Sequence, residues 1–169
     1  MTEVPALTRS ERTAVSMWLL DAARDEATAR DEWATRGVTV LACGGIMSAV
    51  RIPAELVEAA AGSAEPGPVC DFLRQGLRGG PVIADIYTQL YYALVPAATA
   101  TSWPRRDYPG TRCLGSESCL GVPAVDRTEG SPGRSYWCVP PCAAGALCDP
   151  RAVDRLVRDG LRAYVGTAQ

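Results

Sequence analysis

The sequence predicts one α+β domain, residues 1–169, with about six strands in a mainly antiparallel or mixed sheet flanked by helices. A chain of 169 residues suits a single domain with one hydrophobic core, expected here from about residue 8 to about residue 165. Helical and strand patterns also follow one another without the regular alternation that a parallel α/β sheet requires.

The first helix is expected to begin at Thr8, because Thr8 and Glu11 have the spacing of a capping box. Gly37 is expected to end it. The apolar side chains between these points share one helical stripe, made of Val15, Trp18, Ala22, Ala29 and Trp33. We therefore predict a single long helix that its two tryptophans anchor to the core.

The stretch from Gly37 to Pro53 predicts two strands joined by a tight turn at Gly44-Gly45. No acidic residue occurs in this stretch, so a buried strand that carries metal-binding carboxylates is not expected here. Two short helices should follow, one from Pro53 to Ala61 that Gly62 ends, and one marked by apolar residues from Val69 to Leu77 that stops at Gly79-Gly80.

The second half of the chain predicts four more strands and a final helix. The runs PVIADIY and LYYALVP should pair through a turn at Thr88-Gln89. The runs CLGVPAV and SYWCVPP should form two further strands around the polar turn RTEGSPGR. Asp149 is a suitable N-cap and Pro150 a suitable first residue for the last helix.

The composition excludes several kinds of chemistry. The chain has no histidine, and arginine supplies all 17 positive charges, so a histidine general base or metal ligand is impossible. The formal net charge of −2 gives no overall attraction to nucleic acid or membranes. Because no export signal or membrane-length apolar run is evident, we expect a cytoplasmic protein whose seven cysteines are mostly reduced, with no membrane partner.

The segments LYYALVP and CLGSESCLGVPAVDRTEGSPGRSYW resemble the small primase-polymerase domains of the archaeo-eukaryotic primase superfamily, of the bifunctional DNA primase/polymerase N-terminal type. In that family, a strand carrying a histidine leads into an aromatic run that ends in Val-Pro. A glycine-rich strand pair carrying an acid follows, and a proline-rich segment returns as Tyr-Trp. The resemblance covers most of Trp18 to Pro141 and implies a primase-polymerase-like fold.

The resemblance also implies that the catalytic set of this family is missing. Its paired acids belong on the strand from Ile46 to Ile52, where this chain has Ser48, Ala49, Val50 and Arg51. The nucleotide-contacting histidine falls at Gln89, and the third acid falls at or near Arg112. Two Mg²⁺ or Mn²⁺ ions need carboxylates, which guanidinium groups cannot replace, so we expect no polymerase activity and no cofactor.

Ser48, Arg51, Gln89 and Arg112 suggest a different use for the same cleft. If these four residues converge, they form a cationic pocket that can hold a phosphate or a carboxylate. The alternative is that the arginines form ordinary surface ion pairs. The leading prediction is therefore a binding domain for a nucleotide, a nucleic-acid strand or another protein, with Trp103 and Tyr108 as further candidates for recognition.

Two other functions stay open. One is a metal-dependent nucleotide-processing enzyme with a rebuilt acidic site that uses Asp85 and Asp126. The other is a structural protein that self-associates, for example as a homodimer. A cysteine zinc site is a weaker alternative because the spacing lacks paired CxxC knuckles; its candidate ligands are Cys113, Cys119, Cys138, Cys142 and Cys148.

Overall fold

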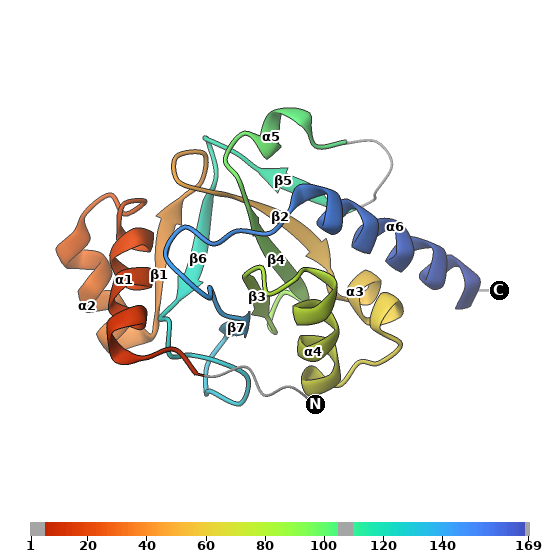
Figure 1. Cartoon of the computed structure of the whole chain (residues 1–169), viewed down its shortest axis with the longest axis horizontal. Coiled ribbons are helices and arrows are strands. Elements are labelled where there is room, and N and C mark those ends of the chain that lie inside the picture. The colour runs from red at the N-terminus through yellow and green to blue at the C-terminus, as the bar shows by residue number, and fades with distance from the viewer. Residues whose placement is uncertain (1–5, 105–109, 168–169) are drawn as a thin grey trace.

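Two antiparallel sheets form the centre of the molecule (Figure 1), whose computed structural model describes residues 6–104 and 110–167. The larger sheet has the strand order β5-β2-β4-β3-β7, and the smaller sheet pairs β1 with β6. The strands are β1 (Val38–Ala42), β2 (Ser48–Pro53), β3 (Val82–Asp85), β4 (Leu90–Val95), β5 (Arg112–Leu114), β6 (Cys119–Pro123) and β7 (Ser135–Val139). The α+β class predicted from the sequence is confirmed.

Six helices surround these sheets in the described part of the chain (Figure 1). They are α1 (Arg9–Leu20), α2 (Glu26–Arg36), α3 (Ala54–Ala61), α4 (Pro66–Gly76), α5 (Thr99–Ser102) and α6 (Pro150–Thr167). None of the helices in residues 6–104 and 110–167 combines the length and the apolar character needed to cross a membrane.

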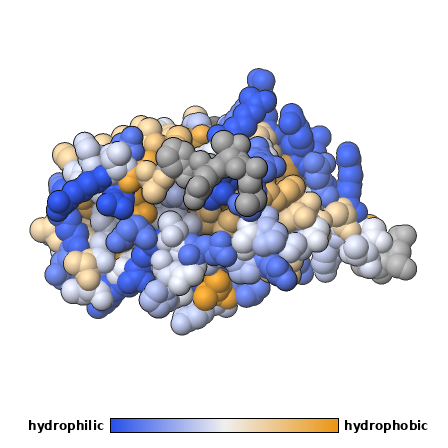
Figure 2. All heavy atoms as spheres, turned by 60° about the horizontal axis from the view of Figure 1, so that its bottom comes forward, coloured by the Kyte–Doolittle hydropathy of each residue, from blue (hydrophilic) through white to orange (hydrophobic). Residues whose placement is uncertain are grey.

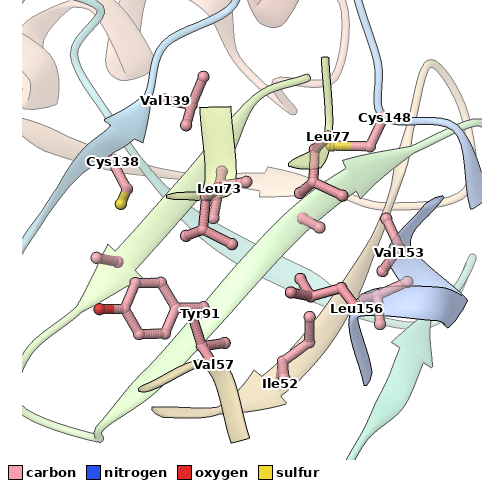
Figure 3. Close-up of a cluster of buried hydrophobic side chains, with 14 of the residues drawn as sticks. Ile52, Val57, Leu73, Leu77, Tyr91, Cys138, Val139, Cys148, Val153 and Leu156 are labelled. Carbon is pink, nitrogen blue, oxygen red and sulfur yellow. The ribbon is translucent and has the colours of Figure 1, made fainter. Parts of the chain in front are cut away.

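The five-stranded sheet carries a hydrophobic cluster on each face. On one face, α3, α4 and α6 pack over β2, β3 and β4, with Val57, Leu73 and Val153 fully or almost fully buried (Figure 3). On the other face, α1 and the inner side of the two-stranded sheet cover one end of the strands, and Trp137 of β7 is fully buried there. The other end of this second face has no such cover, and it carries the candidate site.

The predicted long helix is in fact two helices. The capping box at Thr8 is present, and Gly37 ends the second helix with a φ of 76°. Between them α1 stops at Leu20, and Asp25 caps α2 by accepting a hydrogen bond from the backbone amide of Thr28. The apolar stripe continues across this break because both helices pack against the same cluster, so the stripe alone could not show where the first helix ends.

The predicted pair of strands between Gly37 and Pro53 exists, but the strands do not pair with each other. β1 pairs with β6, whereas β2 pairs with β4 and β5 in the larger sheet. β6 and β7 are divided between the two sheets in the same way. Pairing between distant segments depends on the packing of the whole core, which a local turn signal does not report.

Elements whose signals are local were predicted correctly. β3 and β4 form the expected antiparallel pair in the middle of the larger sheet. Gly62, with a φ of 72°, ends α3 in the left-handed conformation that favours glycine. Asp149 precedes α6, and its carboxylate accepts a hydrogen bond from the amide of Arg151.

Candidate ligand-binding site

Arg51 and Arg112 face each other across neighbouring strands at the uncovered end of the larger sheet. Arg51 lies on β2, directly opposite Arg112 on β5 and opposite Tyr92 on β4. Side chains alternate between the two faces of a strand, so Arg51 shares its face with Ala49, which belongs to the cluster under α1. Opposite residues have Cβ atoms about 5 Å apart, which places the two arginine stems side by side.

The charge of this arginine pair is not neutralised within the described residues. Neither Arg51 nor Arg112 forms an ion pair with a carboxylate in that part of the chain. The Nε atom of Arg51 is buried and has no hydrogen-bond acceptor. Like charges directly opposite each other on a sheet destabilise it, and a buried unpaired donor adds a further cost. An anion between the two guanidinium groups would remove both costs.

A third arginine lies across the sheet from this pair. The Arg134 Nε atom is 3.1 Å from one carboxylate oxygen of Asp85, at the end of β3. Asp85 also accepts hydrogen bonds from the backbone amides of Tyr87 and Thr88. The guanidinium of Arg134 lies 5.9 Å from the centre of the exposed Tyr87 ring, within reach of a cation–π interaction.

Tyr92 lies between the Arg51–Arg112 pair and the Arg134–Asp85 pair. The pKa of Tyr92 is raised by burial and by the neighbouring Asp85 carboxylate, which together outweigh the lowering effects of Arg51, Arg134 and Arg112. Tyr92 therefore stays protonated at neutral pH and can donate a hydrogen bond. Its ring packs against the cluster under α1, so its position is fixed by the core.

Ser48 and Gln89, the other two predicted site residues, do not join the arginine pair. Ser48 is fully buried, three residues from Arg51 and therefore on the opposite face of β2, and its hydroxyl donates to the Ala97 carbonyl at 3.0 Å. Gln89 lies in the turn before β4 with a φ of 58°, and its amide donates to the Ile86 carbonyl at 2.8 Å. Both polar side chains are already bonded to backbone carbonyl groups.

The acidic residues of the alternative enzyme prediction do not form a metal site. Asp85 uses its carboxylate for Arg134 and for two backbone amides. Asp126 is exposed and lines a groove beside α1 and α2 together with Arg9, Arg12 and Arg30. In the described ranges, no three histidine, cysteine, aspartate or glutamate side chains are grouped closely enough to hold a metal ion.

The cysteines considered for zinc do not form a metal-binding group among the described residues. Cys148 is buried beside α6, and its thiol donates to the Pro81 carbonyl, whereas Cys119 and Cys142 are exposed. Burial raises the pKa of Cys113 to about 11 and that of Cys148 to about 12, so neither is a thiolate at neutral pH. Thiols in these positions do not present a ready set of metal ligands.

Of the two recognition residues predicted on the loop after β4, the structure describes only Trp103. Trp103 is 7% exposed and belongs to the core cluster under α6. Tyr108 lies outside the described residues, as do Arg105 and Arg106. Trp103 therefore packs in the core and is not exposed for recognition.

A separate groove, of about 690 Å³, runs along α6. Four arginines and two aspartates line it: Arg151, Asp154, Arg155, Arg158, Asp159 and Arg162. Figure 2 shows hydrophilic side chains standing out at the upper right, where α6 runs toward the end of the chain. Because charges of both signs alternate along this groove and Asp154 already pairs with Arg158, it is a weaker anion site than the Arg51–Arg112 pair.

The sequence did not reveal that Tyr92 and Arg134 belong to the same surface. Tyr92 is two strands from Arg112, and Arg134 lies immediately before β7, the strand at the opposite edge of the sheet. The alternation of Tyr91 and Tyr92 along β4 was the only available signal, and it does not say which face is open.

Comparisons with protein-family models, with curated proteins and with solved structures returned no match for this chain.

Proposed function

We propose that the chain is a binding domain for a phosphate-bearing ligand, a nucleotide or a nucleic-acid strand, held by Arg51 and Arg112. The observation that carries this proposal is the unneutralised arginine pair, one member of which has a buried Nε atom with no acceptor. Guanidinium groups bind phosphate oxygens through paired hydrogen bonds, and such charge-assisted bonds are stronger than neutral ones.

The surroundings of the pair favour a nucleotide-like ligand over a simple anion. Tyr92 offers a ring and a hydroxyl next to Arg51, and the exposed Tyr87 ring lies beside Arg134. Among the described residues, three arginines and one carboxylate lie close enough to Tyr92 to affect its pKa, so this end of the face favours negative ligands. Aromatic rings beside cationic groups suit a base attached to a phosphate.

The resemblance to primase-polymerase domains supports the same assignment. In that family, the positions of Arg51 and Arg112 would hold metal-binding acids that contact a nucleotide triphosphate. We propose a degenerate domain in which guanidinium groups contact the phosphate directly and polymerisation does not occur. Among the described residues, no acidic group comes close enough to Arg51 to restore the metal chemistry.

Titration with ATP and with a single-stranded oligothymidylate, in the absence of divalent metal ions, tests the proposal. We expect saturable changes in backbone amide NMR signals of β2, β4 and β5. Arg51→Met and Arg112→Met should each weaken binding about tenfold or more, since a hydrogen bond to a charged group is worth about 1.5–3 kcal/mol. Arg30→Met removes an arginine that is already paired with Glu26, and should leave binding unchanged.

The proposal fails if neither ligand produces a saturable change. It also fails if Arg30→Met weakens binding as much as Arg51→Met does, because the attraction would then be a general effect of charge. A primer-extension assay with Mg²⁺ and Mn²⁺ covers the enzyme alternative, and activity that disappears in Asp85→Ala would favour that alternative.

A further inference from the structure

A small hollow of about 170 Å³ lies on the helix-covered face of the larger sheet, away from the arginine pair. Ala84 of β3 forms its floor, and it stands directly between Tyr91 of β4 and Tyr136 of β7 in the sheet register. Because alanine carries only a methyl group, space remains between the two aromatic side chains. Glu58 of α3 and Pro66 at the start of α4 complete the walls.

The rings of both tyrosines are largely buried, and their hydroxyl groups form no hydrogen bond with the residues that the structure describes. Tyr91 is 8% exposed and Tyr136 is 7% exposed, and neither hydroxyl forms a hydrogen bond within the described part of the chain. Figure 3 shows the Tyr91 ring lying across the sheet, with its hydroxyl directed away from Val57 and Ile52. Neither oxygen is among the buried side-chain atoms that lack a hydrogen-bond partner, so both hydroxyl groups reach solvent and are free to bond a polar ligand in the hollow.

The Tyr91 hydroxyl lies in an environment shared with Glu58 and Tyr136. Burial raises the pKa of Tyr91, and Cys138, Tyr136, Cys70 and Glu58 raise it further. Burial likewise raises the pKa of Tyr136. Both phenols are therefore protonated at neutral pH, and each can donate one hydrogen bond or accept one from a ligand.

Among the described residues, the lining of the hollow has an acidic group and no cation. Its eleven residues include Glu58 and no arginine, whereas the carboxylate of Asp85 is directed to the opposite face of the sheet, where it binds Arg134. Asp85 is already neutralised by Arg134, but Glu58 has no ion-pair partner in the described residues. Burial, and then the neighbouring Glu55, raise the pKa of Glu58, which means that these surroundings disfavour its negative charge. A bound cation would reverse this effect.

We propose that the hollow between Tyr91 and Tyr136 binds a small organic ammonium ion, with Glu58 as its counter-ion. The carboxylate pairs with the positive charge, the aromatic rings supply cation–π contacts, and the phenol oxygens accept N–H hydrogen bonds. A hollow of about 170 Å³ restricts the ligand to a few non-hydrogen atoms. Because the described lining residues include the Glu58 carboxylate and no arginine, the hollow favours a cation over an anion, and it differs in ligand class from the arginine pair.

Titration of the full chain with methylammonium chloride, followed by backbone amide NMR signals, tests the proposal. We expect saturable shifts at Ala84, Tyr91 and Tyr136, and none with sodium chloride at equal ionic strength. Glu58→Gln keeps the shape but removes the charge, and should weaken binding about tenfold or more. Glu55→Gln removes the same charge from an exposed position on the same helix, and should change binding less than about twofold.

Tyr136→Phe separates the two contributions of the tyrosine, because it keeps the ring and removes the hydroxyl. We expect an intermediate loss of about threefold, with unchanged melting temperature since the hydroxyl has no protein partner. Shifts that grow linearly with methylammonium, an equal loss in Glu55→Gln, or equal shifts with sodium acetate would each overturn the proposal. Because this hollow and the arginine pair lie on opposite faces, neither outcome affects the phosphate proposal.

Discussion

Replacing Arg51 by methionine should make the protein more stable. Methionine keeps the apolar stem that packs on β2 but removes the guanidinium group. Two costs disappear with it. An unpaired buried donor such as the Arg51 Nε atom costs about 1–3 kcal/mol, and a like-charge pair on opposite strands costs about 0.2–1 kcal/mol.

Since Arg51 is partly exposed, water reaches the rest of its guanidinium group, and the lower ends of these ranges apply. We therefore expect the free energy of unfolding to rise by about 1 kcal/mol, which corresponds to a higher melting temperature by about 2–4 °C for a chain of this size. Urea denaturation followed by circular dichroism measures the first quantity, and calorimetry measures the second.

Arg112→Met provides the matched comparison, because Arg112 is exposed and has no buried unpaired nitrogen. It should gain only the repulsion term, about 0.2–1 kcal/mol, and this gain should shrink in about 1 M salt as the charges are screened. In the double variant the repulsion is removed only once, so the two gains should not add fully.

A loss of stability in Arg51→Met would refute this reasoning. That result would mean that the Arg51 guanidinium makes favourable contacts in the free protein. The inference that it is unpaired and available to bind an anion would then be wrong. We expect the opposite result: the Arg51 guanidinium lowers the stability of the free protein, and it becomes favourable only when it binds a ligand.

Two further predictions concern the packing around the sites. A Cβ atom on Gly160 of α6 would lie too close to the Leu56 carbonyl of α3, so Gly160→Ala should lower the free energy of unfolding by about 1–3 kcal/mol. Gly166→Ala on the same helix meets no atom within 4 Å and should be neutral or slightly stabilising by up to about 1 kcal/mol; equal effects in urea denaturation would contradict the close helix contact. Ser48→Ala removes the buried hydrogen bond to the Ala97 carbonyl and should lower the free energy of unfolding by about 1 kcal/mol. It should leave the affinity for ATP unchanged, and a loss of affinity would show that Ser48 takes part in binding.

The parts of the fold that follow from neighbouring residues could be predicted from the sequence. The capping box at Thr8, the β3–β4 pair and the glycine that ends α3 all depend on contacts within a few residues. The separation of β1 from β2 could not be predicted, because it depends on β6, which lies more than 70 residues later in the sequence. The position of Arg112 opposite Arg51 was suggested by a family resemblance and not by any local pattern.

The partial success with the four candidate binding residues has a simple geometric reason. Strand residues separated by an odd number of positions point to opposite faces, so Ser48 and Arg51 could never share a surface while β2 stayed regular. Gln89 sits in a turn, where the two-residue period no longer applies. Only the residues that remained in register, Arg51 and Arg112, could meet.

The same two-residue period explains how one sheet can carry two sites for opposite charges. Tyr91 and Tyr92 are neighbours in the chain, but Tyr91 lines the acidic hollow under the helices while Tyr92 stands beside Arg51 on the uncovered face. The register that separates them is held by the two hydrophobic clusters, since a slip of one residue would move every core side chain of β4 to the wrong face. The core therefore keeps the anion-binding and cation-binding groups apart.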